Sequence, residues 1–256
     1  MTANPISVII NRKHENHADT AVWQIFKKTF PQAVFYFTDY SGHATLLAEK
    51  AALQRDSLLI AVGGDGTINE VVNGMMRVDE EIRKTLALAI LPIGTGNDFV
   101  KSTGLNHSME NLIQAIHLHK SVPIDLGSVS SHQDGKLQTR YFINIADAGL
   151  GGLVAKKFVG LVRWLPAHLA YHVSILRAFL GFRHAMVHVK GDNFEYSGKL
   201  LSLCAANGQW FGSGLGIAPH ANIQDGNLAF VILGDVSLFD YLKYLPKVKK
   251  KEFITH

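Results

Sequence analysis

A hydrophobic segment at residues 57–62 runs without a break into a glycine-rich turn, Gly63-Gly64-Asp65-Gly66-Thr67. Three glycines around one aspartate let backbone N–H groups approach a phosphate closely, and the N-terminus of a following helix adds positive partial charge. We expect Thr67 to be the N-cap of that helix, with Glu70 completing a capping box. The segment therefore predicts a strand, a phosphate-binding turn and a helix, and the alternative is a tight turn that binds no ligand.

The rest of the first half alternates in the same way between short apolar runs and amphipathic stretches. Such alternation predicts a mostly parallel sheet that is covered by helices on both faces, which is the α/β fold class. The expected strands cover residues 6–10, 34–37, 57–62 and 86–93, and the expected helices cover residues 18–30, 43–54, 68–76 and 108–119.

The pattern changes near Val122-Pro123-Ile124-Asp125. Short β-rich segments then alternate with turn signals such as Asp134-Gly135 and Asp225-Gly226-Asn227, which favours antiparallel strands. We therefore predict an α/β domain over residues 1–125 and an antiparallel β-rich domain over residues 126–256. The expected strands of the second domain cover residues 141–145, 186–190, 199–205 and 228–233, with a helical stretch over residues 153–182 between them.

A second glycine-rich turn, Gly94-Thr95-Gly96-Asn97-Asp98, follows the fourth expected strand. Loops after neighbouring parallel strands meet at the carboxyl edge of the sheet, where ligands bind in this fold class. Asp65 and Asp98 are therefore expected to approach a shared site, and two carboxylates beside phosphates would need a divalent cation such as Mg²⁺ between them. The chain has neither a Walker A motif nor the GxGxxG dinucleotide fingerprint.

Charge is unevenly distributed along the chain. Residues 1–147 contain 13 Lys/Arg and 15 Asp/Glu, whereas residues 148–256 contain 12 Lys/Arg and 6 Asp/Glu. No acidic residue occurs between Asp147 and Asp192, where basic residues are interleaved with aliphatic and aromatic ones. This composition suits peripheral contact with an anionic membrane, and the alternative is a helix packed between domains. Nucleic acid is not expected as a partner, because no fold signature for it accompanies the charge.

The single cysteine, Cys204, excludes an intrachain disulfide and is typical of a reducing compartment. The apolar run at residues 6–10 is too short for the core of a signal peptide, and no run is long enough for a transmembrane helix. We therefore expect a cytoplasmic protein that can bind peripherally to the inner membrane surface.

Two segments of the sequence, Gly63-Gly64-Asp65-Gly66-Thr67-Ile68-Asn69-Glu70-Val71 and Leu91-Pro92-Ile93-Gly94-Thr95-Gly96-Asn97-Asp98-Phe99, together resemble the diacylglycerol kinase family, and most closely its bacterial lipid kinase branch. The resemblance extends from the first strand to about Leu233. The GGDGT turn alone also fits NAD kinases, but the complete ordered set of motifs favours lipid kinases. The further motifs are Ile124-Asp125-Leu126-Gly127, Phe142-Ile143-Asn144, Gly149-Leu150-Gly151, Ala206-Asn207-Gly208 and the segment from Ala218 to Leu228.

The resemblance implies a nucleotide-binding α/β domain followed by a β-sandwich domain that takes a lipid acceptor. It implies ATP and Mg²⁺ as cofactors, and transfer of the γ-phosphoryl group to a lipid hydroxyl such as that of diacylglycerol. If the protein oligomerises, we expect a dimer. The residues implied are Asp65 and Asp98 for catalysis; Asn11, Thr38, Gly63, Gly64, Asp65, Gly66, Thr67, Ile68, Asn69, Glu70, Gly94, Thr95 and Asn97 for the nucleotide; and Asp125, Asn222, Asp225 and Asn227 for metal.

The sequence departs from the family pattern in two places. The family's Asn-Pro-x-Ser/Ala-Gly after the first strand is replaced by Asn11-Arg12-Lys13-His14-Glu15. The family's general base, a glutamate in an Asp-Gly-Glu triplet, has no counterpart, because the three Asp-Gly pairs are not followed by Glu. We therefore expect the chain to lack the family's C-terminal segment, or the protein to lack this base.

Three alternatives stay open at this point. The protein is a lipid kinase, a NAD kinase-like enzyme, or a nucleotide- and membrane-binding protein without catalysis. The Asp225-Gly226 segment, similarly, is either a structural Mg²⁺ site or a simple turn.

Overall fold

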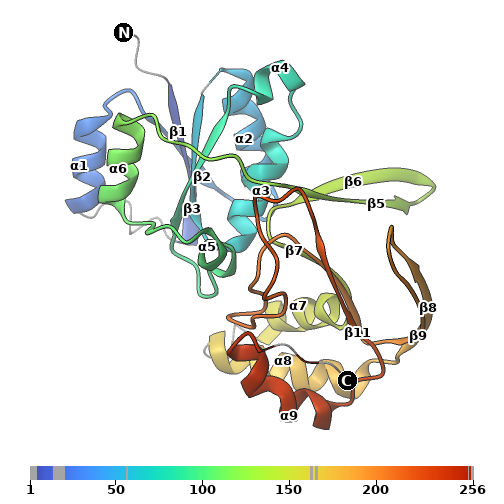
Figure 1. Cartoon of the computed structure of the whole chain (residues 1–256). Coiled ribbons are helices and arrows are strands. Elements are labelled where there is room, and N and C mark those ends of the chain that lie inside the picture. The colour runs from blue at the N-terminus through green and yellow to red at the C-terminus, as the bar shows by residue number, and fades with distance from the viewer. Residues whose placement is uncertain are drawn as a thin grey trace. The chain divides into compact units, whose positions relative to one another are not determined.

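The fold was analysed in a computed structural model of the chain, which describes residues 5–13, 21–55, 57–161, 164, 167–252 and 254. The backbone forms two compact units, Met1–Ile143 and Asn144–His256, whose elements are labelled in Figure 1. Each unit has its own sheet and its own hydrophobic core. The division after Ile143 lies later in the chain than the boundary that we expected after Asp125.

The first unit is built on a four-stranded parallel sheet with the order β2-β1-β3-β4. Each strand was expected from its apolar run, and each is extended or shifted at its ends by only a residue or so. The sheet is buried on both faces, since Val8 and Ile10 on one face and Ile9 and Leu59 on the other are fully enclosed. The bounds are β1 Ile6–Asn11, β2 Val34–Thr38, β3 Leu58–Gly63 and β4 Ala87–Pro92.

Helices cover both faces of this sheet, with α1 and α6 on one side and α2 and α3 on the other (Figure 1). Phe26 of α1 and Leu112 of α6 enter the same core cluster as the strands. Residues 18–20 of the expected first helix lie outside the described residues. The bounds are α1 Ala21–Thr29, α2 His43–Leu53, α3 Asp65–Met75, α4 Glu80–Arg83, α5 Asp98–Thr103 and α6 Met109–His117.

A two-stranded hairpin, β5 (Gly127–Gln133) and β6 (Lys136–Phe142), completes the first unit. The expected turn at Asp134-Gly135 joins its strands, and both turn residues have positive φ angles of 51° and 75°. Asn73 of α3 anchors the hairpin, because its Nδ2 donates to the Tyr141 carbonyl at 2.8 Å and its Oδ1 accepts from the Tyr141 N–H at 3.0 Å. This anchoring is why the hairpin belongs to the first unit.

The second unit is antiparallel, as expected. Its three-stranded sheet has the order β11-β10-β7, and a separate hairpin joins β8 to β9. The expected strands 141–145 and 199–205 were wrong in detail, because each spans parts of two real strands separated by a break. The bounds are β7 Ile145–Gly149, β8 Ala185–Lys190, β9 Glu195–Leu200, β10 Ser202–Ala206 and β11 Ala229–Leu233.

Three helices accompany these strands: α7 (Leu150–Leu161), α8 (Ala167–Gly181) and α9 (Leu238–Lys249). The expected helical stretch 153–182 is therefore two helices, and residues 162, 163, 165 and 166 lie outside the described part. A capping box between Ser237 and Asp240 starts α9, which continues through Pro246. Within the described residues, no helix is long and apolar enough to cross a membrane. The predicted fold class, a parallel α/β domain followed by an antiparallel β domain, is confirmed.

Candidate functional site

The carboxyl ends of all four parallel strands lie along one edge of the first unit's sheet. Asn11 ends β1 and pairs in register with Thr38 at the end of β2. Gly63 ends β3 and pairs with Pro92 at the end of β4. The two glycine-rich loops and the two polar residues implied in nucleotide binding therefore start from the same edge, as expected from parallel pairing.

The two glycine-rich loops touch each other through their backbones. A Cβ added to Gly64 would lie 3.1 Å from the Cα of Gly94, and a Cβ added to Gly94 would collide with the Cα of Gly64. Gly63 is confined differently, because a Cβ there would lie 2.5 Å from Thr67 Oγ1. The chain's own packing therefore excludes a Cβ at positions 63 and 94, and at position 64 a Cβ would fit only if Gly94 shifted by a few tenths of an ångström.

Helix α3 starts earlier than expected. Its N-cap is Gly64, and its first hydrogen bond runs from the Ile68 N–H to the Gly64 carbonyl at 3.1 Å. Thr67 therefore lies inside the helix, and the predicted capping box of Thr67 with Glu70 is wrong. The N–H groups of Asp65, Gly66 and Thr67 precede the first helical bond and have no acceptor within the helix.

Gly66 stands apart from the other glycines of this turn. It is exposed, and a Cβ added there would meet no atom within 4 Å. The fold itself therefore does not require glycine at position 66. Open space beside three N–H groups at the positive end of an 11-residue helix is what a phosphate group needs.

The carboxylate of Asp65 is turned towards the second loop. Its Oδ2 accepts the N–H of Asp98 at 3.0 Å, and its Oδ1 accepts the N–H of Phe99 at 2.9 Å. Asp65 thus caps α5. The structure does bring Asp65 and Asp98 together, but the buried carboxylate of Asp98 forms an ion pair with Lys101 at 2.7 Å. Lys101 was missed, although its spacing to Asp98 within one helix turn was a usable signal.

Glu70 acts as a cap on another helix. Its Oε1 accepts the N–H of Gly42 at 2.8 Å, and its Oε2 accepts the N–H of Ala44 at 3.2 Å, at the start of α2. Ile68 is fully buried in the core. These two residues of the implied nucleotide site therefore use their side chains for the fold, and Asn69 offers its carbonyl to Asn73.

Asn97 holds the second loop in shape. Its Oδ1 accepts the N–H of Gly94 at 3.0 Å, and its Nδ2 donates to the Gly94 carbonyl at 2.8 Å. Asn97 itself has a positive φ of 49° as the N-cap of α5. Thr95, at the tip of this closed turn, is exposed and faces solvent.

Asn11 and Thr38, at the ends of β1 and β2, each form a hydrogen bond at this edge of the sheet. Asn11 Nδ2 donates to Thr67 Oγ1 at 3.1 Å, and Thr38 Oγ1 accepts the N–H of Arg12 at 3.3 Å. The Arg12 guanidinium pairs with the Asp39 carboxylate, N to O, at 2.5 Å. From the sequence, Arg12 was noted only as a departure from the family pattern, and Asp39 was not expected at this edge.

The two carboxylates that are expected to hold Mg²⁺, those of Asp65 and Asp98, both form contacts within the protein. Both oxygens of Asp65 accept N–H groups, and Asp98 is neutralised by Lys101. Asp125 lies half-buried in the loop before β5. Across the described ranges, no group of three or more His, Cys, Asp or Glu could hold a metal ion.

The implied second metal site forms a turn. Asp225 Oδ1 accepts the N–H of Asn227 at 2.9 Å, Asn227 Nδ2 donates to the Asp225 carbonyl at 2.8 Å, and Gly226 has a φ of 72°. Asn222 Oδ1 accepts the N–H of Gln224 at 3.1 Å. These contacts form an Asp-Gly turn, and a structural Mg²⁺ site at this segment stays a prediction.

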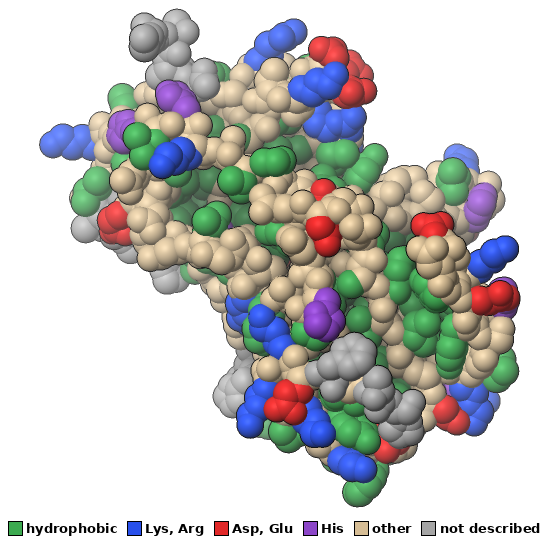
Figure 2. Space-filling model, viewed as in Figure 1, with side chains coloured by type: hydrophobic (Ala, Val, Ile, Leu, Met, Phe, Trp, Pro, Cys, Tyr) green, Lys and Arg blue, Asp and Glu red, His purple; other side chains and the backbone are tan. Residues whose placement is uncertain are grey.

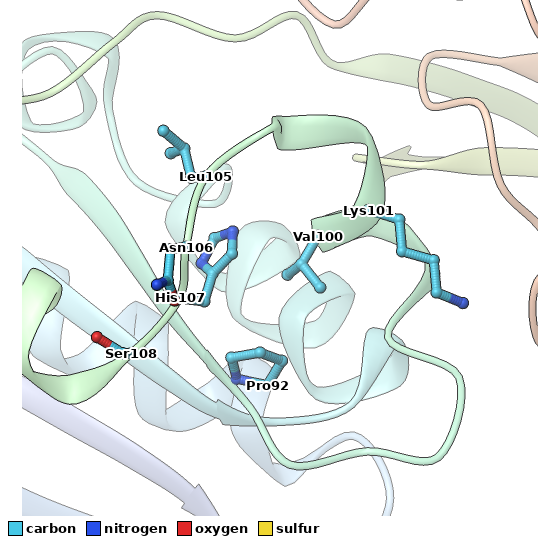
Figure 3. A pocket seen from close by; sticks show the side chains of 7 residues that line it. All are labelled: Pro92, Val100, Lys101, Leu105, Asn106, His107 and Ser108. Carbon is cyan, nitrogen blue, oxygen red and sulfur yellow. The ribbon is translucent and has the colours of Figure 1, made fainter.

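An open pocket of about 540 Å³ lies beside the end of β4. Figure 3 shows its lining residues, among them Pro92, Val100, Lys101 and His107. Thr103 Oγ1 lies 2.8 Å from His107 Nε2, and the Ile90 carbonyl lies 3.3 Å from Nδ1. Burial lowers the pKa of His107 below its usual 6.5, partly offset by the Ile90 carbonyl. No sequence pattern indicated this pocket.

Comparison with known families matches both halves of the chain. The sequence model of the Diacylglycerol kinase catalytic domain matches residues 5–129. The YegS C-terminal NAD kinase beta sandwich-like domain matches residues 144–256. Residues 5–129 belong to the diacylglycerol kinase catalytic domain family. The chain contains the C-terminal domain, so our expectation of a missing C-terminal segment is corrected to that extent, although the sequence has no Asp-Gly-Glu triplet.

Two relatives of this chain carry kinase names. The Diacylglycerol kinase of Bacillus subtilis (strain 168) is 29% identical over 245 residues, which cover 90% of this chain and 76% of that protein. The "Probable lipid kinase YegS-like" of Yersinia pestis (strain Pestoides F) is 31% identical over 192 residues, covering 75% of this chain and 62% of that protein. The chain thus spans less than two thirds of this second relative.

A solved structure supports the fold. The crystal structure of a diacylglycerol kinase from Bacillus anthracis str. Sterne has a TM-score of 0.66 and 21% sequence identity, and the match covers 100% of this chain and 81% of that one. At this identity the likeness shows the fold alone.

Proposed function

We propose that this protein transfers the γ-phosphoryl group of ATP to the hydroxyl of a lipid such as diacylglycerol. The observation that carries the proposal is the start of α3, where the N–H groups of Asp65, Gly66 and Thr67 have no acceptor within the helix and Gly66 is exposed with open space beside it. Relatives that bear the names diacylglycerol kinase and lipid kinase support a lipid acceptor. In this proposal residues 1–125 bind the nucleotide and residues 126–256 belong to the lipid-acceptor domain, whose first hairpin, β5 and β6, packs on α3 within the first unit.

In the proposed reaction the lipid hydroxyl oxygen attacks the γ-phosphorus, the bond to the leaving oxygen of ADP breaks, and the hydroxyl proton passes to a base. The N–H groups at the start of α3 bind the phosphates and stabilise the charge that develops on them. Thr95 adds a hydroxyl at the tip of the second loop. Asp65 and Asp98 act as positioning residues, because their carboxylates are committed to α5 and to Lys101.

A lipid acceptor requires contact with a membrane surface, and the exposed hydrophobic and basic side chains of α9 are suited to such contact. Phe239 is 75% and Leu242 is 56% exposed, one turn apart. Lys243, Lys247 and Lys249 of the same helix are also exposed. Figure 2 shows basic and hydrophobic side chains interspersed over the region where α9 lies in Figure 1. Exposed aromatic and aliphatic residues beside lysines favour the interface of an anionic bilayer.

Helix α8 of the same unit also carries exposed hydrophobic and basic side chains. It packs on α9 through Phe179 and Tyr241, whose ring centroids lie 5.4 Å apart. Leu176 and Leu180 of α8 are 46% and 78% exposed, with Arg177 exposed between them. Trp164, which precedes α8, is 86% exposed. We therefore assign peripheral contact with anionic lipid to α8 and α9.

A lipid phosphorylation assay tests the proposed activity. The chain is incubated with radiolabelled ATP and Mg²⁺ against diacylglycerol, phosphatidylglycerol, undecaprenol, a sphingoid base and NAD. We expect label in a lipid and none in NAD. Phosphorylation of NAD alone would support the NAD kinase alternative. ATP binding without turnover of any acceptor would support the non-catalytic alternative.

Vesicle sedimentation tests the membrane contact. We expect the double variant Phe239→Ser, Leu242→Ser to bind vesicles of phosphatidylglycerol and phosphatidylcholine at least about tenfold more weakly than the parent. The matched control is Leu137→Ser, which removes a 63% exposed leucine from the first unit. Equal loss of binding in both variants would contradict the assignment.

A further inference from the structure

One side chain of α3 holds the backbone of β6, the strand that leads towards the end of the first unit (Figure 1). The Nδ2 of Asn73 donates to the Tyr141 carbonyl at 2.8 Å and its Oδ1 accepts the Tyr141 N–H at 3.0 Å, across 68 residues of sequence. Nδ2 also donates to the Asn69 carbonyl at 2.8 Å, one turn earlier in α3. The amide therefore uses both of its N–H groups and its oxygen, a combination that among side chains of this length only asparagine offers.

Asn73 takes the place of a neighbouring strand on the outer edge of β6. The other edge of β6 pairs with β5, where Ser128 lies opposite Tyr141. In an antiparallel ladder, the N–H and the carbonyl of one residue point to the same side of its strand. Those of Tyr141 point towards α3, and the two bonds to Asn73 satisfy both of them. The hairpin is thus fixed to α3 in a defined register.

The chain is anchored a second time where the second unit begins. Ile143 ends the first unit and Asn144 starts the second. The Asn144 carbonyl accepts the N–H groups of Asn207 and Gly208 at 2.8 and 3.1 Å. Its Nδ2 donates to the Trp210 carbonyl at 2.9 Å. Because only two residues separate this anchor from the one on β6, a displacement of β6 would also move the start of the second unit.

The helix that carries Asn73 is also held by α2. Thr45 Oγ1 of α2 donates to the Glu70 carbonyl at 3.0 Å. A Cβ added to Gly74 would collide with the Thr45 carbonyl, so the two helices touch through their backbones. Asn73 lies nine residues beyond the N-cap Gly64, which is about 13 Å along the helix. Loss of the Asn73 contacts should therefore free the hairpin and leave the phosphate-binding end of α3 in place.

We propose that Asn73 is a positioning residue for phosphoryl transfer. It holds the first hairpin of the proposed acceptor domain on the helix that binds the phosphates, and it touches neither substrate. Transfer requires the acceptor hydroxyl and the γ-phosphorus to be aligned, and a displacement of about 1 Å can slow such a step about a hundredfold. The inference rests on the proposed function. It goes beyond that function by naming a remote residue that links the nucleotide-binding part of the chain to the acceptor part.

Two near-isosteric variants test this role. Asn73→Leu removes the three hydrogen bonds of this side chain, whereas the control Thr45→Val removes the side-chain hydrogen bond that joins α2 to α3. We expect both variants to lower the urea midpoint. Both should leave unchanged the calorimetric affinities for ATP and for inorganic tripolyphosphate, which reports on the phosphate turn alone.

The lipid assay and amide hydrogen exchange then separate the two variants. The kcat of Asn73→Leu should fall about tenfold to a hundredfold at unchanged KM for ATP, while Thr45→Val keeps the parent rate. Exchange at the Tyr141 N–H should accelerate in Asn73→Leu only. Asn73→Asp keeps an acceptor for this N–H and loses both donated bonds, so its kcat should lie between those of the parent and Asn73→Leu.

Equal kcat values in Asn73→Leu and Thr45→Val would overturn this inference and leave the proposed function standing. If Asn73→Leu does not fold, the same comparison is made between Asn73→Asp and Thr45→Val. A loss of rate matched by an equal loss of tripolyphosphate affinity would also overturn the inference, because the effect would then arise at the phosphate turn. Failure of the parent chain to phosphorylate any of the lipids would overturn both this inference and the proposed function.

Discussion

Asp65 Oδ2 accepts the backbone N–H of Asp98 at 3.0 Å, so the aspartate of the first glycine-rich loop caps the helix that follows the second loop. The other carboxylate oxygen accepts the N–H of Phe99 at 2.9 Å. A carboxylate at a helix N-terminus satisfies donors that the helix leaves free and faces the positive end of its dipole. The two loops are therefore one structure, joined by this side chain and by the contact of Gly64 with Gly94.

We predict that Asp65→Ala lowers both stability and activity. Loss of the two charge-assisted hydrogen bonds should reduce the free energy of unfolding by about 1–2 kcal/mol. The second loop then moves relative to the phosphates, which should slow phosphoryl transfer about a hundredfold or more. Urea denaturation and the lipid assay measure the two effects.

Asp79→Ala is the matched control for this variant. Asp79 is the exposed N-cap of α4 and makes no side-chain capping hydrogen bond. Its replacement should change the free energy of unfolding by less than about 0.5 kcal/mol and leave the rate unchanged. If Asp65→Ala were as stable as Asp79→Ala, the capping role of Asp65 would be refuted.

Gly66→Ala should separate stability from ligand binding. Alanine in a helix is more favourable than glycine by about 0.5–1 kcal/mol, and a Cβ at position 66 meets no atom. The variant should therefore be as stable as the parent or slightly more stable. It should nevertheless bind tripolyphosphate at least about tenfold more weakly, because the Cβ enters the space of the phosphate. Gly152→Ala, in the first turn of α7 and equally open, should gain stability without loss of binding. Intact phosphate binding in Gly66→Ala would place the phosphates elsewhere.

Glu70→Gln should loosen the start of α2. A glutamine side chain keeps one oxygen acceptor, so only one of the two N–H groups now bonded to Glu70 can be satisfied. Amide hydrogen exchange at Gly42 and Ala44 should accelerate, and the free energy of unfolding should fall by about 1 kcal/mol. Exchange at Asp98 and Phe99, which depend on Asp65, serves as the internal reference and should not change. Unchanged protection of both Gly42 and Ala44 would contradict the assignment.

The stability of the protein should fall in mild acid through His107. Burial lowers the pKa of this histidine in the folded state, so the unfolded chain binds the proton more tightly. The free energy of unfolding should then decrease as the pH falls below the unfolded value of 6.5, and this loss should continue down to the folded pKa. Urea midpoints between pH 7.5 and about pH 5 measure the slope. His107→Gln should flatten it, whereas His132→Gln, at an exposed position of β5, should not.

The backbone around the site could be predicted from local sequence patterns. Apolar runs placed the four parallel strands within a residue or so, because burial on both faces demands continuous hydrophobicity. The glycine-rich turns were recognised because close backbone approach excludes side chains, as Gly64 and Gly94 show. The breaks between β6 and β7, and between β9 and β10, were missed, since both strands of each pair are apolar near the break.

The roles of the polar side chains were decided only by the tertiary structure. Asp65 finds its partner 33 residues away in sequence and Glu70 finds Gly42 28 residues away, so no local pattern identifies these contacts. The sequence by itself determined the fold class, the positions of the two glycine-rich turns and the family resemblance. The sheet, by bringing four strand ends to one edge, decided which carboxylates cap helices and which, such as Asp39, stay at the surface. Backbone hydrogen-bond donors left free at helix starts are satisfied by whichever carboxylate the fold brings within reach, and that depends on packing, not on sequence spacing.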